Sequence, residues 1–366
     1  MRRFIATAGV QIAPHGKTTM SRELFALQMA DGAWGMTAAT VGHVRIYREF
    51  GLDRILLANQ LVGRQGIRYI VAELNRDPKF DFYCLIDSFE SLALLEAGLV
   101  ENGLTRPMNV LVELGYAGGR AGVRDDEQAI ALARKVAASP MFSLRGIEAF
   151  EGIVQGSTGD EAKVVSLLDR VQHLGNVVHS EGLFSGKPIL SAGGSSFFDL
   201  VAAKLGDGDD ASSFEVILRS GCYLVHDSHF YQHMIDRLTD RSPLAAGLGE
   251  GLKPALELWA YVHSRPEPTR LIVGLGKRDT SDDVAAPNLL GWCRPGSDVV
   301  LPLTDHRTVR LDDQHAYLDI PADSPLQPGD MVIFGVSHPC TTFDKWRTMF
   351  VVDDALRVVD IVETNF

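Results

Sequence analysis

Residues Pro14–Met20 read Pro-His-Gly-Lys-Thr-Thr-Met and connect a strand-like run to a helix-like run near the start of the chain. The run before them, Gly9–Ala13, is short and apolar, and Ser21–Leu27 after them has a helical composition. Lys17 is therefore expected at a strand end, where burial and neighbouring groups can hold a lysine amine in its neutral form. A Schiff-base lysine needs that form. A solvated loop lysine is the alternative, so the rest of the chain has to decide.

Short apolar runs recur after this stretch, each ending in small, polar or glycine residues. Together with the first run they are 10–13, 35–40, 54–59, 82–87, 109–114, 145–150, 188–194 and 214–219. Helical composition separates them in 88–99, 125–138 and 160–180, the last with apolar residues at three- and four-residue steps. This rhythm predicts a (β/α)8 TIM-type barrel. A doubly wound open sheet is the alternative, because strand order cannot be read from one sequence.

The pattern changes after residue 235. Strand-like runs punctuated by Pro, Gly and Asp follow, at 256–262, 270–273, 309–311, 316–320, 330–334 and 349–352. Helical periodicity is absent there. We therefore expect a barrel domain over residues 1–235 and an all-β domain over 236–366, with the break inside 228–253.

Composition narrows the class of protein. The chain has 366 residues, 46% of them hydrophobic, and a formal net charge of -12. Such an acidic chain is a poor partner for nucleic acid. No apolar run is long enough to span a bilayer, and the start lacks the apolar core of a secretion signal. The four cysteines are scattered, which favours a reducing compartment. We expect a cytoplasmic protein without membrane or nucleic-acid partners.

Several polar residues follow the predicted barrel strands, where a barrel of this kind places its active site. Arg120 follows the fifth strand, Gln155 the sixth and Gly193–Ser196 the seventh, and Tyr223 closes the eighth. The Gly-Gly-Ser-Ser turn before a helix is a plausible phosphate cradle, with a serine helix cap as the alternative. A lysine at one strand end and a phosphate cradle at another point to pyridoxal phosphate as cofactor.

A second motif lies in the expected β domain. His338 and Cys340 are two residues apart, so in extended chain both side chains project to one face. Imidazole and thiolate suit zinc, and two protein ligands would leave positions open for water and substrate. The alternative is a histidine and a cysteine that merely share a turn.

These motifs, in this order, resemble those of the D-threonine aldolase and D-serine dehydratase family, and the resemblance covers nearly the whole chain. The stretches that carry it are Pro14–Thr18, Gly119–Gly122, Ser191–Ser195, Arg219–Tyr223 with Asp227, and His338–Cys340. The resemblance implies the alanine-racemase-like fold, fold type III of the pyridoxal phosphate enzymes. Family members usually carry a further strand and helix before the lysine strand, so we expect the natural chain to be longer at this end.

The resemblance also implies a role for each candidate residue. Lys17 would be the Schiff-base lysine, and His338 and Cys340 would hold Zn²⁺ or another divalent metal. The remaining candidates would contact the cofactor, at its ring oxygen, ring or phosphate: Arg120, Gln155, Tyr223, Gly194 and Ser195.

The implied activity is that of a lyase on D-β-hydroxy amino acids. Aldolase members tend to carry Asp where this chain has Cys340, whereas zinc-dependent D-serine dehydratases carry Cys. We therefore expect a dehydratase that releases a keto acid and ammonia from substrates such as D-serine. A D-threonine or 3-hydroxy-D-aspartate aldolase with the same lysine and metal is the alternative, and a metal-free amino-acid racemase is a more distant one.

Other classes are less favoured. A pyridoxal phosphate carrier protein of this fold would not need residues 236–366, and a zinc hydrolase on a barrel would want two histidines on the first strand, where only His15 is present. The expected partners are a small D-amino acid substrate and, by resemblance, a second copy of the chain in a homodimer.

Overall fold

The computed structural model describes residues 1–366 except 154–159, 207–210, 229, 250 and 298. The described residues group into two compact units. The first unit contains residues 1–17, 26–221 and 242–249, and the second contains 18–25, 222–241 and 250–366. Both units take more than one segment of the chain, so a single boundary between residues 235 and 236 stays a prediction.

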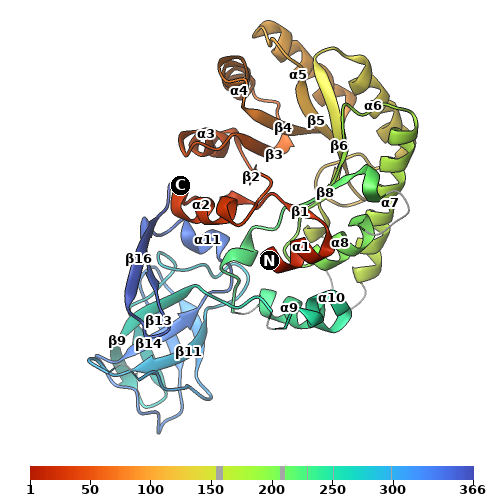
Figure 1. Ribbon diagram of the computed structural model, residues 1–366. Coiled ribbons are helices and arrows are strands. Elements are labelled where there is room, and N and C mark those ends of the chain that lie inside the picture. Colours follow the sequence, from red (N-terminus) through yellow and green to blue (C-terminus); the bar gives the residue numbers. More distant parts are fainter. Residues whose placement is uncertain (154–159, 207–210, 229, 250, 298) are drawn as a thin grey trace. The chain divides into compact units, whose positions relative to one another are not determined.

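The first unit is built on one sheet of eight parallel strands in the order β1-β8-β7-β6-β5-β4-β3-β2 (Figure 1). The strands are β1 Gln11–Ile12, β2 Met36–Ala38, β3 Arg54–Gln60, β4 Asp81–Ile86, β5 Met108–Leu114, β6 Phe142–Ala149, β7 Ile189–Ala192 and β8 Glu215–Leu218. The two ends of this order meet, because His15 and Thr37 form a parallel bridge and Thr37 N donates to Pro14 O at 2.8 Å. The sheet therefore closes, and the predicted (β/α)8 barrel is confirmed.

Helices of the first unit lie on the outside of this sheet (Figure 1). They are α1 Arg2–Ala8, α3 Val41–Glu49, α4 Arg64–Arg76, α5 Phe89–Glu101, α6 Asp126–Ala138, α7 Asp160–Ser180, α8 Phe198–Gly206 and α10 Pro243–Gly247. Two further helices are α2 Arg22–Ala30, which begins in the second unit, and α9 Phe230–Arg241, which belongs to the second unit. Side-chain caps fix several starts: Thr40 Oγ1 accepts from His43 N at 3.2 Å, and Asp125 Oδ1 accepts from Gln128 N at 2.8 Å. The range 228–253, which was predicted to contain the break between the two domains, is largely helical in its described residues. The first strand after it begins at Glu257.

Apolar side chains fill the barrel interior. One buried cluster takes residues from six of the eight strands or their ends: Ala13, Leu56, Tyr83, Leu85, Leu111, Ile189 and Ile217. Strands buried on both faces need such continuous apolar runs, which is why their sequence signal is strong. The packed interior leaves chemistry to the loops at the carboxyl ends of the strands.

The second unit contains a six-stranded antiparallel sheet in the order β11-β14-β9-β10-β13-β12 and a separate β15–β16 hairpin. Its elements are β9 Glu257–Glu267, β10 Arg270–Val273, β11 Asn288–Cys293, β12 Arg307–Leu311, β13 Ala316–Asp319, β14 Met331–Gly335, α11 Cys340–Phe343, β15 Thr348–Val352 and β16 Val358–Glu363. The all-β expectation is confirmed, apart from short helices such as α11.

Two strands of this unit, β11 and β16, are not predicted from the sequence. β11 contains Gly291 beside a register shift, and a Cβ there would meet Val300 Cγ1 at 2.8 Å, so glycine is needed and weakens the strand signal. β16 pairs with β15 and exposes most of its apolar side chains. In the part of the chain that the structure describes, no helix combines the length and apolar character needed to cross a membrane.

Candidate functional site

Lys17 lies in the 3-10 turn η1 (Gly16–Thr18), directly after β1. The backbone before it is held on both sides, since Ala13 N donates to Leu218 O of β8 at 2.8 Å and Thr37 Oγ1 of β2 donates to Ala13 O at 2.7 Å. The lysine side chain itself is exposed. The predicted strand-end position is confirmed, but the lysine is positioned by its backbone and not by burial of its side chain.

His15 lies close to several positively charged side chains at this strand end. Its Nδ1 atom is buried and has no hydrogen-bond partner among the described residues. Burial lowers the pKa of His15 well below its ordinary value, and the cations Lys17, Arg219 and Arg120 lower it further. Positive groups therefore converge on the rim of the barrel. A positively charged rim favours the binding of an anionic ligand. The neutral imidazole of His15, with its unused ring nitrogen, can form a hydrogen bond with such a ligand.

Arg219 is the buried cation of this group. It follows β8, and its Nη2 atom donates to Glu148 Oε2 of β6 at 2.7 Å, with both side chains almost fully buried. Its Nε atom donates to Ser191 Oγ of β7 at 3.0 Å. Burial raises the pKa of Glu148 to about 8, although Arg219 opposes the rise. Through its contacts with Glu148 and Ser191, Arg219 links the ends of β6, β7 and β8.

The Gly-Gly-Ser-Ser turn follows β7 and precedes α8, as predicted. A Cβ atom on Gly194 would meet Glu151 Oε1 at 2.6 Å, so this position requires glycine. Glu151 is buried, and its carboxylate accepts hydrogen bonds from Gly193 N at 2.9 Å and Gly194 N at 2.5 Å. These two amides thus already have an acceptor, and a phosphate would rely on the turn at Ser195 and the start of α8.

The other predicted cofactor contacts are less closely grouped. Arg120 is exposed in the loop between β5 and α6, and its guanidinium lies 5.0 Å from the centre of the Phe150 ring. Tyr223 lies in the 3-10 turn η4 (Cys222–Leu224), which belongs to the second unit. Gln155 lies outside the described residues.

His338 and Cys340 lie together in the second unit, at the end of β14 and the start of α11. Asp283 Oδ2 contacts His338 Nδ1 at 2.8 Å, and Thr341 Oγ1 donates to Asp283 Oδ1 at 3.4 Å. A hydrogen bond with Cys340 and a second one with Asp283 raise the pKa of His338 to about 9. The histidine is therefore a cation at neutral pH, held between a carboxylate and a sulfur.

The Cys340 sulfur has two further neighbours in the same unit. Cys222 Sγ lies 3.2 Å away and Thr18 Oγ1 lies 3.3 Å away. Hydrogen bonds with Cys222, His338 and Thr18 hold the pKa of Cys340 well below its ordinary value. These contacts favour the thiolate form of Cys340, which is the form that binds metals. Thr18 is the residue that follows Lys17 in the chain.

The donors fit a metal ion in their chemistry. With His338 Nδ1 held by Asp283, the other ring nitrogen is the one that would bind an ion, and a metal would displace the imidazolium proton beside the thiolate. No three His, Cys, Asp or Glu side chains in the described ranges are grouped to hold a metal ion. The metal at His338 and Cys340 therefore stays a prediction.

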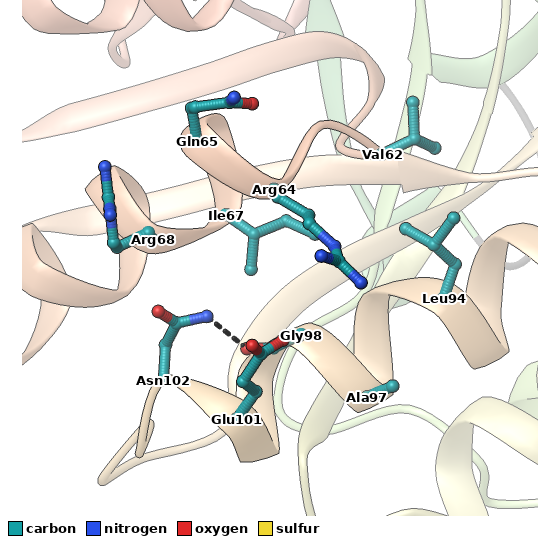
Figure 2. A pocket seen from close by; sticks show the side chains of 10 residues that line it. All are labelled: Val62, Arg64, Gln65, Ile67, Arg68, Leu94, Ala97, Gly98, Glu101 and Asn102. Carbon is teal, nitrogen blue, oxygen red and sulfur yellow. Dashed lines mark hydrogen bonds between the residues drawn. The ribbon is translucent and has the colours of Figure 1, made fainter.

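A hollow of about 480 Å³ lies elsewhere on the barrel, between α4 and α5 (Figure 2). Arg64 and Arg68 of α4 and Glu101 and Asn102 of α5 line it. These helices lie outside the sheet, and the hollow includes none of the predicted site residues.

Sequence reasoning missed four side chains that the structure places beside predicted ones: Glu151, Asp283, Cys222 and Arg219. Glu151 follows a predicted strand, which is a usable signal. Asp283 is 55 residues from His338, and Cys222 is 118 residues from Cys340, so spacing could not have found them.

The chain is similar in sequence to several known proteins. The family model described as "Putative serine dehydratase domain" matches residues 255–352. The chain is 26% identical to D-threonine aldolase of Arthrobacter sp, over 97% of this chain and 85% of that protein. It is 24% identical to 3-hydroxy-D-aspartate aldolase of Paracoccus denitrificans, over 94% of this chain and 83% of that protein.

Solved structures show the same fold. D-threonine aldolase from Filomicrobium marinum superposes with a TM-score of 0.79 at 20% identity, over 100% of this chain and 90% of that one. D-threo-3-hydroxyaspartate dehydratase from Delftia sp. HT23 gives 0.75 at 18% identity, over 100% and 92%. Two solved variants of that dehydratase replace a histidine and a cysteine two positions apart, and the cysteine variant is in a metal-free form.

A closed β/α barrel with a lysine after its first strand, together with an antiparallel β unit, matches the alanine-racemase-like fold. These comparisons confirm the resemblance of this chain to the D-threonine aldolase and D-serine dehydratase family of pyridoxal phosphate-dependent lyases.

Proposed function

We propose that this protein uses pyridoxal phosphate and a divalent metal to dehydrate D-β-hydroxy amino acids such as D-serine, releasing a keto acid and ammonia. The observation that carries the proposal is the pair His338 and Cys340, with Asp283 on the histidine at 2.8 Å. The related dehydratase from Delftia, in which a metal-free form accompanies loss of a cysteine from a similarly spaced pair, supports this assignment.

The cofactor would be held by the barrel rim. Lys17 would bind its carbonyl carbon, the turn at Ser195 that Gly194 shapes would receive its phosphate with the start of α8, and Arg120 would contact its ring. When bound, pyridoxal phosphate accepts the electrons of the bond that breaks at the substrate α-carbon. Lys17, released by the incoming substrate amine, would then take the α-proton as general base. His15, kept neutral by its lowered pKa, can accept a hydrogen bond without adding charge.

The metal would be held by His338 and Cys340. A thiolate and an imidazole favour Zn²⁺ over harder ions, although other divalent metals remain candidates. When bound, the metal acts as a Lewis acid on the β-hydroxyl group, which is otherwise a poor leaving group. Asp283 would orient the imidazole for this task, and Thr18 would donate to the Cys340 thiolate.

Aldol cleavage is the second candidate function, because the relatives from Arthrobacter and Paracoccus that this chain matches over 85% and 83% of their length are aldolases. The same residues would serve it: a base would take the proton of the β-hydroxyl, and the Cα–Cβ bond would break in place of the C–O bond. D-threonine and 3-hydroxy-D-aspartate would then yield glycine and an aldehyde or glyoxylate.

A panel of D-serine, D-threonine and 3-hydroxy-D-aspartate separates these reactions. We expect keto acid and ammonia from at least one substrate, loss of product after chelation, and recovery with zinc. Aldehyde or glyoxylate without keto acid would replace the dehydratase by the aldolase. Exchange of the α-proton in deuterated water with neither product, and without need of metal, would leave the racemase.

Lys17→Ala is the companion variant. We expect it to lose the cofactor absorbance band that borohydride bleaches, and to lose about 10²–10⁴-fold in rate. A variant that keeps the band and the activity would disprove the lysine assignment.

We further propose a homodimer. Its support is the β15–β16 hairpin, where Phe350, Val359 and Ile361 are exposed by 68%, 61% and 48%.

A cytoplasmic location is also proposed, supported by the four cysteines, none of which forms a disulfide.

A further inference from the structure

We infer that Cys222 and Cys340 form a thiol pair that hydrogen peroxide converts to a disulfide, and that this bond takes Cys340 away from the metal. The inference rests on the proposed metal role of Cys340 for its functional consequence, but the pairing itself rests on geometry. The two sulfurs lie 3.2 Å apart within the second unit, about 1.2 Å more than a disulfide bond of about 2.0 Å.

The positions of the two residues favour closure. Cys222 begins the turn η4, and Cys340 begins the short helix α11. Thr18 Oγ1 lies 3.3 Å from the Cys340 sulfur and 3.9 Å from the Cys222 sulfur, so both sulfurs contact the same hydroxyl. Cys340 is half-buried and Cys222 is buried. Peroxide would therefore reach Cys340 first.

The other two cysteines lack such an arrangement. Cys84 is buried against Met108 Sδ at 3.8 Å, and burial raises the pKa of its thiol to about 12. Burial also raises the pKa of Cys293. Thiols of this kind react slowly with oxidants, so they serve as internal controls.

The chemistry balances with peroxide as the oxidant. The Cys340 sulfur attacks one peroxide oxygen, the O–O bond breaks, and a sulfenic acid and hydroxide form. The Cys222 sulfur then attacks the sulfenic sulfur, the S–S bond forms, and water leaves. Two thiols and one peroxide thus give one disulfide and two waters. Cys340 has then lost the thiolate that would bind the metal.

The test treats the metal- and cofactor-loaded protein with hydrogen peroxide. We expect thiol titration of the denatured chain to fall from four groups to two, and non-reducing peptide mapping to join the peptides of Cys222 and Cys340. Metal should leave in step with the bond, and dithiothreitol with added zinc should restore the thiols, the metal and the activity.

Cys222→Ser is the decisive variant, with Cys293→Ser as the matched control. Cys222→Ser keeps a hydrogen-bond donor beside Cys340 but should form no cross-link. Its Cys340 should proceed to sulfinic or sulfonic acid, which dithiothreitol does not reverse. Cys293→Ser should behave like the unaltered chain.

Two outcomes would overturn the inference: no cross-link in the unaltered chain, or a cross-link to Cys84 or Cys293 in its place. A cross-link that forms without loss of metal would keep the thiol pair and reject the metal assignment of the proposed function.

Discussion

Asp283 makes a single 2.8 Å contact with His338 Nδ1, and this contact decides which ring nitrogen can serve a ligand. A carboxylate in this position orients the imidazole and strengthens it as a donor. Asp283 itself is kept ionised: burial would raise its pKa, but the hydrogen bond from His338 and its charge bring it below the ordinary value. At the scale of single residues, the metal hypothesis thus depends on a side chain outside the His-Pro-Cys motif.

Asp283→Asn should weaken zinc binding by about 10–100-fold, because the amide cannot hold the imidazole as the carboxylate does. Competition with a chromogenic chelator measures the affinity directly. The neighbouring Asp282→Asn is the matched control, since Asp282 pairs with Lys277 at 3.1 Å and does not contact His338 in the contacts described. Equal zinc affinity in both variants would remove Asp283 from the site.

Glu148 gives a second prediction at this scale. Burial raises its pKa from 4.5 to about 8, so between these values the folded protein holds a proton that the unfolded chain releases. The free energy of unfolding should therefore fall as the pH rises through this range, by at most about 1.4 kcal/mol per pH unit. The Glu148→Gln variant removes this titrating group and nearly keeps the shape of the side chain.

Urea unfolding across this pH range tests the point. The stability of Glu148→Gln relative to the unaltered chain should increase as the pH rises. A relative stability that stays flat across this range would mean that the ionised pair of Glu148 and Arg219 outweighs the cost of burial.

At the scale of elements, the turn between β7 and α8 is shaped by a carboxylate from another loop. Glu151, in the 3-10 turn η2 (Glu151–Ile153) after β6, accepts from Gly193 N and Gly194 N. Neighbouring strands of a parallel sheet bring the loops after them to one edge, so this contact follows from β6 pairing with β7. The turn is therefore preformed by the protein itself.

Gly194→Ala should lower the affinity for pyridoxal phosphate by about tenfold or more, equivalent to about 1.4 kcal/mol. The new Cβ would meet Glu151 Oε1 at 2.6 Å and Gly152 Cα at 3.1 Å, which forces the turn to shift. Absorbance titration of the cofactor measures the loss. Gly247→Ala, where a Cβ meets nothing within 4 Å, should bind as the unaltered chain does. An unchanged affinity in Gly194→Ala would argue that the phosphate binds elsewhere.

At the scale of the whole molecule, the β15–β16 hairpin is the exposed apolar surface that the homodimer proposal has to explain. Val359→Glu places a charge on this hairpin, where the valine is 61% exposed, and should shift the mass in light scattering from dimer to monomer. Val62→Glu is the control, because Val62 is 49% exposed on the barrel and lies outside the hairpin. A dimer that survives Val359→Glu would move the interface away from this hairpin.

Much of the architecture could be predicted at this scale, and for a clear reason. All eight barrel strands and the helices 88–99, 125–138 and 160–180 were expected within a few residues of their observed positions, because strands buried on both faces are continuous apolar runs. The β unit was harder: β11 is interrupted by Gly291, and β16 is largely exposed, so neither carries a burial pattern in its sequence.

The amino-acid sequence predicted the individual barrel strands, the position of Lys17 after the first of them, and the nearness of His338 to Cys340, because each depends on residues only a few positions apart. Only the folded chain showed that the sheet closes, that Asp283 holds His338, that Cys222 lies beside Cys340, and that Glu151 occupies two amides of the phosphate turn. The contacts of Asp283, Cys222 and Glu151 join residues 42 to 118 positions apart. Such pairings are set by how strands and loops pack, and local periodicity carries no record of them.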